Sequence, residues 1–104
     1  MNTQAIIENP PRISTVRITD TSLTYVLEDG REITVPLGYY PTLALASSAE
    51  RANYEVYSVS VHWPDLDADI GVEGLLLGAK ELPIYAERAA RRARRRNSQS
   101  RRAA

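Results

Sequence analysis

The chain has 104 residues, 43% of them hydrophobic, and no cysteine. It is therefore suited to a single domain, and disulfide scaffolds, thiol catalysis and thiolate zinc sites are excluded. The net charge of zero hides an asymmetry: the first 87 residues carry thirteen acids and five bases, a net −8, whereas the remainder carries eight arginines and no acid, a net +8.

Residues 1–11 are expected to form a flexible lead-in, because Pro10 and Pro11 interrupt regular hydrogen bonding. This segment lacks the basic start and long apolar stretch of a secretion signal. The longest apolar run, near residues 72–79, is far shorter than the ~20 residues that span a bilayer. We therefore expect a cytoplasmic protein without membrane contact.

Three short strands are predicted next. The segment 13–18 is rich in β-branched residues, which favour strands. The segments 23–27 and 33–37 alternate largely apolar and polar residues, and Asp29-Gly30 between them is a strong signal for a type I′ turn. The sequence thus predicts a β-hairpin here.

A helix is predicted to begin at Pro41, because proline at the first helical position loses no hydrogen bond. Leu43, Leu45 and Ala46 fall on one face of this helix, and residues 50–53 extend it.

A fourth strand is predicted over residues 57–63, where apolar and polar residues alternate until Pro64. Its buried face contains Tyr57, Val59, Val61 and Trp63, so Trp63 is expected to anchor the core.

A short helix is predicted within residues 69–78, with Asp69 as its N-cap and Gly78 as its C-terminal stop. Beyond Gly78 the alanines favour a helix, but arginines surround nearly all of it and leave no wide apolar stripe. We expect this helix to fray near Arg96, with disorder beyond.

Together these elements predict the α+β class. A small antiparallel sheet, made of the hairpin and one or two further strands, packs against one or two short helices. The compact domain is expected over residues 12–79, and residues 80–104 form a helical or disordered arginine-rich tail.

Four motifs occur in order: Asp29-Gly30-Arg31, then Val35-Pro36-Leu37, then residues 62–67 (HWPDLD), then residues 75–78 (LLLG). Over about residues 12–78 the chain resembles the small bacterial domain-of-unknown-function family 2442. The resemblance implies a compact α+β domain and an antitoxin-like or regulatory role beside a small partner protein. No catalytic residues are attributed to that family, so none are carried over to this chain. Some members carry an appended helix-turn-helix; this chain has the arginine tail instead.

The acidic run Asp65, Asp67 and Asp69 resembles the start of a calcium loop. That loop also needs glycine at its sixth position and glutamate at its twelfth, where this chain has Ile70 and Leu76. We interpret the run as a solvated turn with helix caps.

His62 is the chain's single histidine and faces opposite Trp63 in the predicted strand. A lone imidazole binds metal weakly, and no catalytic triad accompanies it, so a structural or surface role is expected. We predict no catalytic, cofactor or metal site.

Tyr39 and Tyr40 lie in a predicted connector, where binding residues concentrate. Packing over a sheet edge is the favoured interpretation, and contact with a partner is the alternative.

The tail arginines form an anion-binding element suited to phosphate contacts. Its target is nucleic acid, an acidic protein surface (including this chain's own body), or none if the tail only solubilises the chain. The arginines are Arg88, Arg91, Arg92, Arg94, Arg95, Arg96, Arg101 and Arg102.

The sequence therefore predicts a non-enzymatic binding or regulatory module that contacts a small partner protein. The alternative is a nucleic-acid-binding accessory protein whose tail anchors phosphates without reading sequence. The oligomeric state is open.

Overall fold

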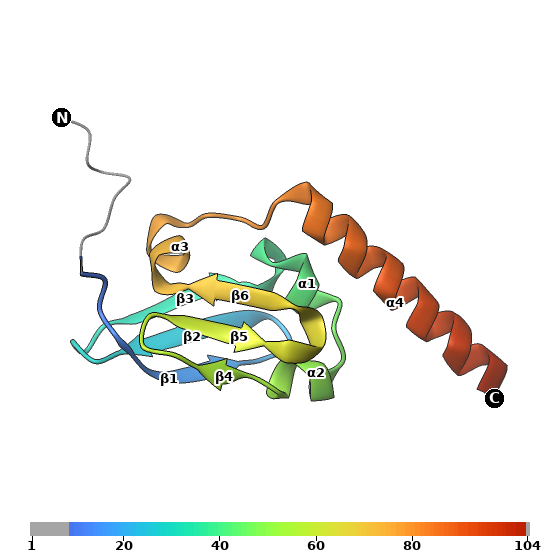
Figure 1. The fold of residues 1–104 in the computed structure, drawn as a ribbon, viewed down its shortest axis with the longest axis horizontal. Helices are drawn as coiled ribbons and strands as arrows, with labels where there is room; N and C mark the ends of the chain where they lie inside the picture. The colour runs from blue at the N-terminus through green and yellow to red at the C-terminus, as the bar shows by residue number, and fades with distance from the viewer. Residues whose placement is uncertain (1–8, 104) are drawn as a thin grey trace.

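Two three-stranded antiparallel sheets form the body of the protein (Figure 1). The computed structural model describes residues 9–103, with side chains through residue 98. The first sheet contains β1 (Ile13–Ile18), β2 (Ser22–Leu27) and β3 (Glu32–Pro36), and the second contains β4 (Glu55–Val56), β5 (Ser60–Trp63) and β6 (Ala68–Gly71). The α+β class is confirmed, and the strands divide between two sheets.

The predicted hairpin is present as β2 and β3, with Leu23 opposite Val35. Its turn differs from the predicted type I′. A type I′ turn needs a positive φ at both Asp29 and Gly30, but of these two residues only Gly30 has one, of 97°. The Gly30 N–H donates to the Leu27 carbonyl at 3.0 Å. This geometry is a type I turn followed by a left-handed glycine, which adds residues to the loop.

The core lies between the two sheets. Leu23 and Tyr25 from β2 meet Val61 and Trp63 from β5, and all four are fully buried. The Tyr25 hydroxyl also donates to the Ile70 carbonyl of β6 at 2.8 Å. This bond ties the centre of the first sheet to the edge of the second.

The predicted helix from Pro41 is two short helices, α1 (Pro41–Ala44) and α2 (Ser48–Ala52), preceded by the 3-10 turn η2 (Leu37–Tyr39). Pro41 does begin α1. The break follows from a capping box: the Ser47 hydroxyl accepts from the Glu50 N–H at 3.1 Å, and the Ser47 N–H donates to the Glu50 carboxylate at 2.8 Å.

The predicted fourth strand is partly wrong. Val61 and Trp63 are fully buried in β5, but Tyr57 is 53% exposed and Val59 is 37% exposed. Both lie in the turn between β4 and β5, which the Tyr57 N–H closes by donating to the Ser60 carbonyl at 2.8 Å. A short apolar alternation does not distinguish a strand from a turn that reverses the chain.

The predicted N-cap Asp69 is also wrong, because Asp69 lies in β6 and the helix starts later. Gly71 caps α3 (Val72–Leu77). The predicted stop at Gly78 is confirmed by its left-handed φ of 69°. Upstream, the 3-10 turn η3 (Pro64–Leu66) ends at Asp67, whose φ is 51°.

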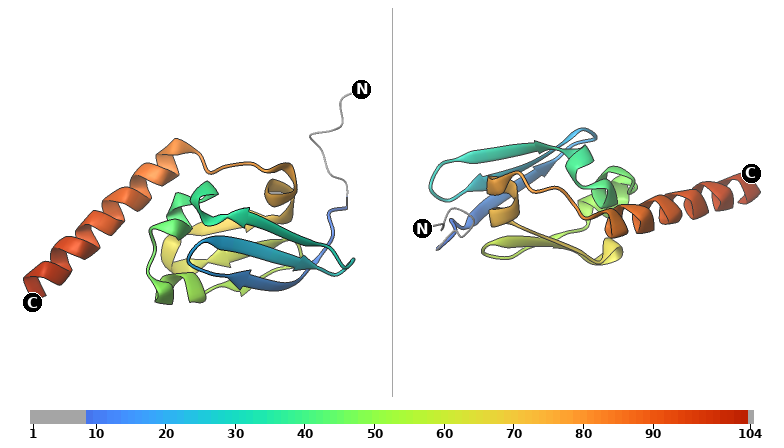
Figure 2. Two further views of the ribbon diagram at one scale, coloured as in Figure 1. Left: turned by 180° about the vertical axis from the view of Figure 1, so that it is seen from behind. Right: turned by 90° about the horizontal axis from the view of Figure 1, so that it is seen from above.

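The helix α4 (Pro83–Ala103) continues past Arg96, where the sequence predicts fraying. It rests on α1 near its start and then projects beyond the body (Figures 1 and 2). Ala89, on the side facing α1, is only 2% exposed. Over residues 9–103, none of the helices combines the length and apolar character needed to cross a bilayer.

Candidate functional site: a groove beneath helix α4

The segment between α3 and α4 is held across the start of α1 by hydrogen bonds. The Glu81 carboxylate accepts from the Thr42 N–H at 2.9 Å and from the Thr42 hydroxyl at 2.6 Å. The Glu81 N–H donates to the Tyr39 carbonyl at 2.9 Å. The Tyr40 hydroxyl donates to the Ala79 carbonyl at 3.1 Å. Together these bonds fix where α4 begins.

Alanines allow α4 to lie close to α1. Ala86, Ala89 and Ala93 follow the i, i+3, i+7 spacing of one helical face, and each is buried or half-buried. Near the far end of this contact, Arg96 donates to the Leu45 carbonyl at 2.8 Å and pairs with Glu50 at 3.3 Å. The small side chains replace the wide apolar stripe that the sequence lacks.

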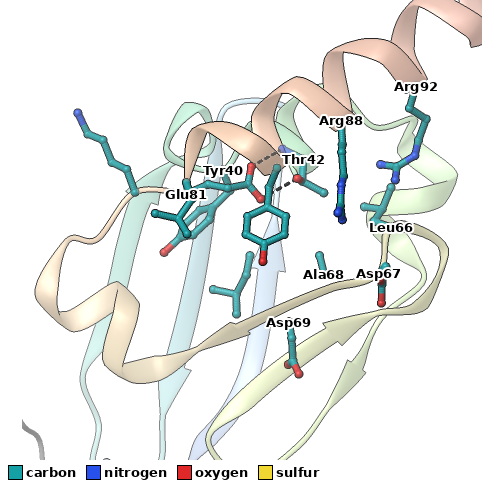
Figure 3. Close-up of a pocket in the computed structure, with 13 residues that line it drawn as sticks. Tyr40, Thr42, Leu66, Asp67, Ala68, Asp69, Glu81, Arg88 and Arg92 are labelled. Atoms are coloured by element: carbon teal, nitrogen blue, oxygen red, sulfur yellow. Dashed lines mark hydrogen bonds between the residues drawn. The ribbon is translucent and has the colours of Figure 1, made fainter.

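A groove of about 430 Å³ remains between α4 and β6 (Figure 3). The apolar residues of its floor are Leu66 from η3, Ala68 and Ile70 from β6, and the ring of Tyr40, which precedes α1. Charged residues of opposite sign line its two sides. Asp67 and Asp69 lie on the side of β6, and Arg88 and Arg92 project from α4 (Figure 3). The remaining lining residues are Thr42, Lys80, Glu81, Leu82 and Tyr85.

The groove keeps its charges apart. Among the described side chains, no ion pair within 4 Å joins these arginines to these aspartates. The Arg88 guanidinium lies 5.5 Å from the centre of the Tyr85 ring, a cation–π contact. Burial, together with the neighbouring Glu81 carboxylate, raises the pKa of Tyr40. Tyr40 therefore stays neutral and serves as a hydrogen-bond donor.

The structure gives the two predicted partner tyrosines different environments. Tyr40 is 7% exposed and forms part of the groove floor. Tyr39 is half-buried, with the Lys80 ammonium 5.0 Å from its ring centre. Partner contact by either residue stays a prediction.

The predicted anion-binding arginines divide into groups. Arg88 and Arg92 face the groove, whereas Arg96 binds the body. Arg91, Arg94 and Arg95 have exposed side chains. They form no ion pair or hydrogen bond with the described residues. Arg101 and Arg102 lie in α4, and their side chains are outside the described residues.

His62 lies between two carboxylates on the second sheet, opposite Glu55 on β4 and Asp69 on β6. Its Nδ1 atom is buried and has no hydrogen-bond partner among the described residues. Over those residues, no group of three or more histidine or acidic side chains is arranged to hold a metal ion.

Sequence reasoning missed the groove. Glu81 and Thr42 are 39 positions apart, and their bonds decide where α4 crosses β6. The sequence offers one signal, Pro83, which marks a helix start two residues after Glu81. That signal does not specify where the helix docks.

The family model for "Protein of unknown function (DUF2442)" matches residues 13–81, about two thirds of the chain. The chain belongs to this family. A crystal structure of a protein of unknown function from Rhodospirillum rubrum is similar to this DUF2442 chain at 24% identity, with a TM-score of 0.63. That similarity covers 75% of this chain and 99% of the other, and it concerns the fold alone. No curated protein matches the sequence.

The DUF2442 match includes β6 and Glu81 and stops before α4. The groove therefore combines a strand edge from the family domain with arginines that lie outside the matched region. Features of this groove that depend on Arg88 and Arg92 are properties of this chain, and the family match does not imply them.

Proposed function

We propose that this chain acts by binding and not by catalysis, and that α4 anchors it to the phosphate backbone of nucleic acid. The observation that carries the proposal is the division of α4 into two sides. Alanines face α1, while Arg91, Arg94 and Arg95 are exposed and unpaired among the described side chains. Guanidinium groups bind phosphate oxygens in bidentate geometry, which matches such a free set.

Such binding is indifferent to nucleotide sequence. Phosphate contacts position a protein on a duplex but carry no base information. The body, with its net −8, repels phosphate, so the affinity comes from α4. A cytoplasmic location, as expected from the sequence, is part of this proposal.

A small partner protein is the second candidate, and exposed apolar side chains favour it. Leu82, Ile84 and Tyr85 lie next to each other at the start of α4 and are 61%, 55% and 44% exposed. Exposed apolar patches of this kind occur where proteins contact each other. The antitoxin-like regulatory role that the resemblance implies belongs to this candidate.

Salt titrations test the nucleic-acid proposal. Each neutralised phosphate contributes about −0.9 to the slope of log K against log salt for a duplex. With about half of the tail arginines engaged, we expect a slope of roughly −3 to −5 on two unrelated duplexes. In the variant R91Q/R94Q/R95Q the slope should become less negative by roughly 2 to 3.

The matched control is R12Q/R17Q/R31Q, which removes the same charge from the body. It should leave the slope nearly unchanged. An equal loss in both variants would show that only net charge matters. Strong preference for one duplex, or no binding by the full chain, would overturn the proposal and leave the partner protein.

A further inference from the structure

The strand β6 is the edge of the second sheet, and its outer edge faces the groove. The Val72 N–H donates to the Val59 carbonyl at 2.9 Å, which sets the hydrogen-bonding register between β5 and β6. Bonded and non-bonded residues alternate in an antiparallel pair. The N–H and C=O groups of Asp69 and the N–H of Gly71 therefore point away from β5, toward the free edge, while the Gly71 carbonyl begins α3.

Side chains beside this edge provide an apolar surface and two cations. The accessible apolar side chains are Leu82 and Tyr85, which are exposed, and the buried residues Leu66, Ala68 and Tyr40 form the floor beneath them. Arg88 and Arg92 are one helical turn apart on α4 and turn toward the same end of β6, above Ala68 and Leu66 (Figure 3).

We propose that this groove binds an extended peptide that adds to β6 as a fourth, antiparallel strand, with a carboxylate of the peptide held by Arg88 and Arg92. Strand addition obtains affinity from main-chain bonds and specificity from pockets for alternate side chains. The antiparallel direction brings the peptide's carboxyl end to the start of β6, where the two arginines lie.

The charges favour this occupant over nucleic acid. Asp67 and Asp69 line the strand side of the groove and repel a phosphate backbone. They suit a peptide with basic side chains toward the outer face of the sheet and apolar side chains toward the floor. This site lies on the groove side of α4, so it does not depend on the exposed arginines of the proposed nucleic-acid anchor.

The probe is a fluorescein-labelled peptide, Lys-Val-Lys-Val-Lys-Val, with a free C-terminal carboxylate, measured by fluorescence polarisation with the full chain. Its C-terminal amide is the matched control. A charge-assisted bond contributes enough for about a tenfold difference in affinity between the two peptides. An amidated peptide that ends in glutamate tests whether a side-chain carboxylate serves equally. Tighter binding of either carboxylate peptide supports the proposal, and equal binding of the plain amide overturns it.

Two arginine variants locate the site. R88Q/R92Q should abolish the difference between the acid and the amide, whereas R91Q/R95Q, with the same charge loss on the exposed side of α4, should preserve it. The reverse pattern, or equal effects, overturns the proposal.

The edge itself is tested at position 69. Asp69→Pro removes an outward N–H without removing a bond to β5, and it should reduce peptide binding about tenfold. Asp69→Asn removes the charge only and should keep the acid-over-amide preference. If Asp69→Pro fails to fold by circular dichroism, N-methylation of alternate probe amides replaces it. Two probes are compared, one methylated at the odd-numbered amides and one at the even-numbered amides. Equal binding of both methylated probes and the unmethylated probe would overturn strand addition.

Discussion

Trp63 shows how one side chain joins two parts of the body. It is fully buried, its indole N–H donates to the Arg51 carbonyl at 3.0 Å, and its ring lies 5.9 Å from that of Tyr54. Arg51 is in α2, so the indole links the second sheet to the helices. A buried tryptophan stabilises the fold through the apolar area that it removes from water, and the hydrogen bond of its indole N–H fixes the orientation of the ring.

We expect Trp63→Ala to lower the free energy of unfolding by ~3–5 kcal/mol, because it leaves a large cavity in the core. Urea unfolding followed by circular dichroism measures it. Tyr57→Ala is the control, since Tyr57 shares the predicted strand parity but is 53% exposed, and its cost should be below ~0.5 kcal/mol. Similar costs for both substitutions would contradict the burial described for Trp63.

At the scale of elements, the short helix α1 and the α3–α4 segment stabilise each other. The Glu81 carboxylate reaches both the N–H and the hydroxyl of Thr42, and Thr42 is only 6% exposed. Backbone N–H groups in the first turn of a helix have no intrahelical acceptor, so this carboxylate serves as a cap supplied from a distant segment.

Glu81→Ala should therefore lower the free energy of unfolding by ~1–3 kcal/mol, the range for losing bonds to a charged group. A double-mutant cycle with Thr42→Val should give a coupling energy of about 1 kcal/mol or more. Glu87→Ala, an exposed acid on α4, is the matched control and should cost less than ~0.5 kcal/mol. A coupling energy near zero would show that the Glu81–Thr42 bonds do not stabilise the fold.

At the scale of the whole molecule, α4 is partly docked and partly projecting. Ala89 and Arg96 contact the body, and the longest dimension of the chain is 55 Å against 28 and 20 Å across. The composition break predicts a compact domain that ends at residue 79, with a dispensable tail. Because Ala89 and Arg96 contact the body, we expect that the first half of α4 also adds stability.

Two truncations decide this boundary. A chain that ends at Ser98 keeps every described contact of α4 and should retain the full free energy of unfolding. A chain that ends at Leu82 loses the burial of Ala89 and the Arg96 bonds, and should be less stable by roughly 1–3 kcal/mol. If the shorter chain is equally stable, and trypsin removes α4 from the full chain without delay, the boundary at residue 79 is correct.

Local chemistry in the sequence determined the β2–β3 hairpin, the start of α1 at Pro41, the stop at Gly78 and the burial of Trp63. Each depends on a backbone preference of one residue or on a short alternation, so neighbouring residues suffice to predict it. The family match over residues 13–81 also follows from sequence motifs alone.

Tertiary structure decided the division of the strands into two sheets, the docking of α4 and the groove beside β6. The turn at Tyr57 and Val59 depends on which strands pair, and α4 is held by bonds between residues 39 or more positions apart. Alanine on α4 buries little area by itself and becomes a docking face only once α1 is in place. Contacts of this kind have no local sequence signal, because their energy depends on surfaces that exist only after the chain has folded.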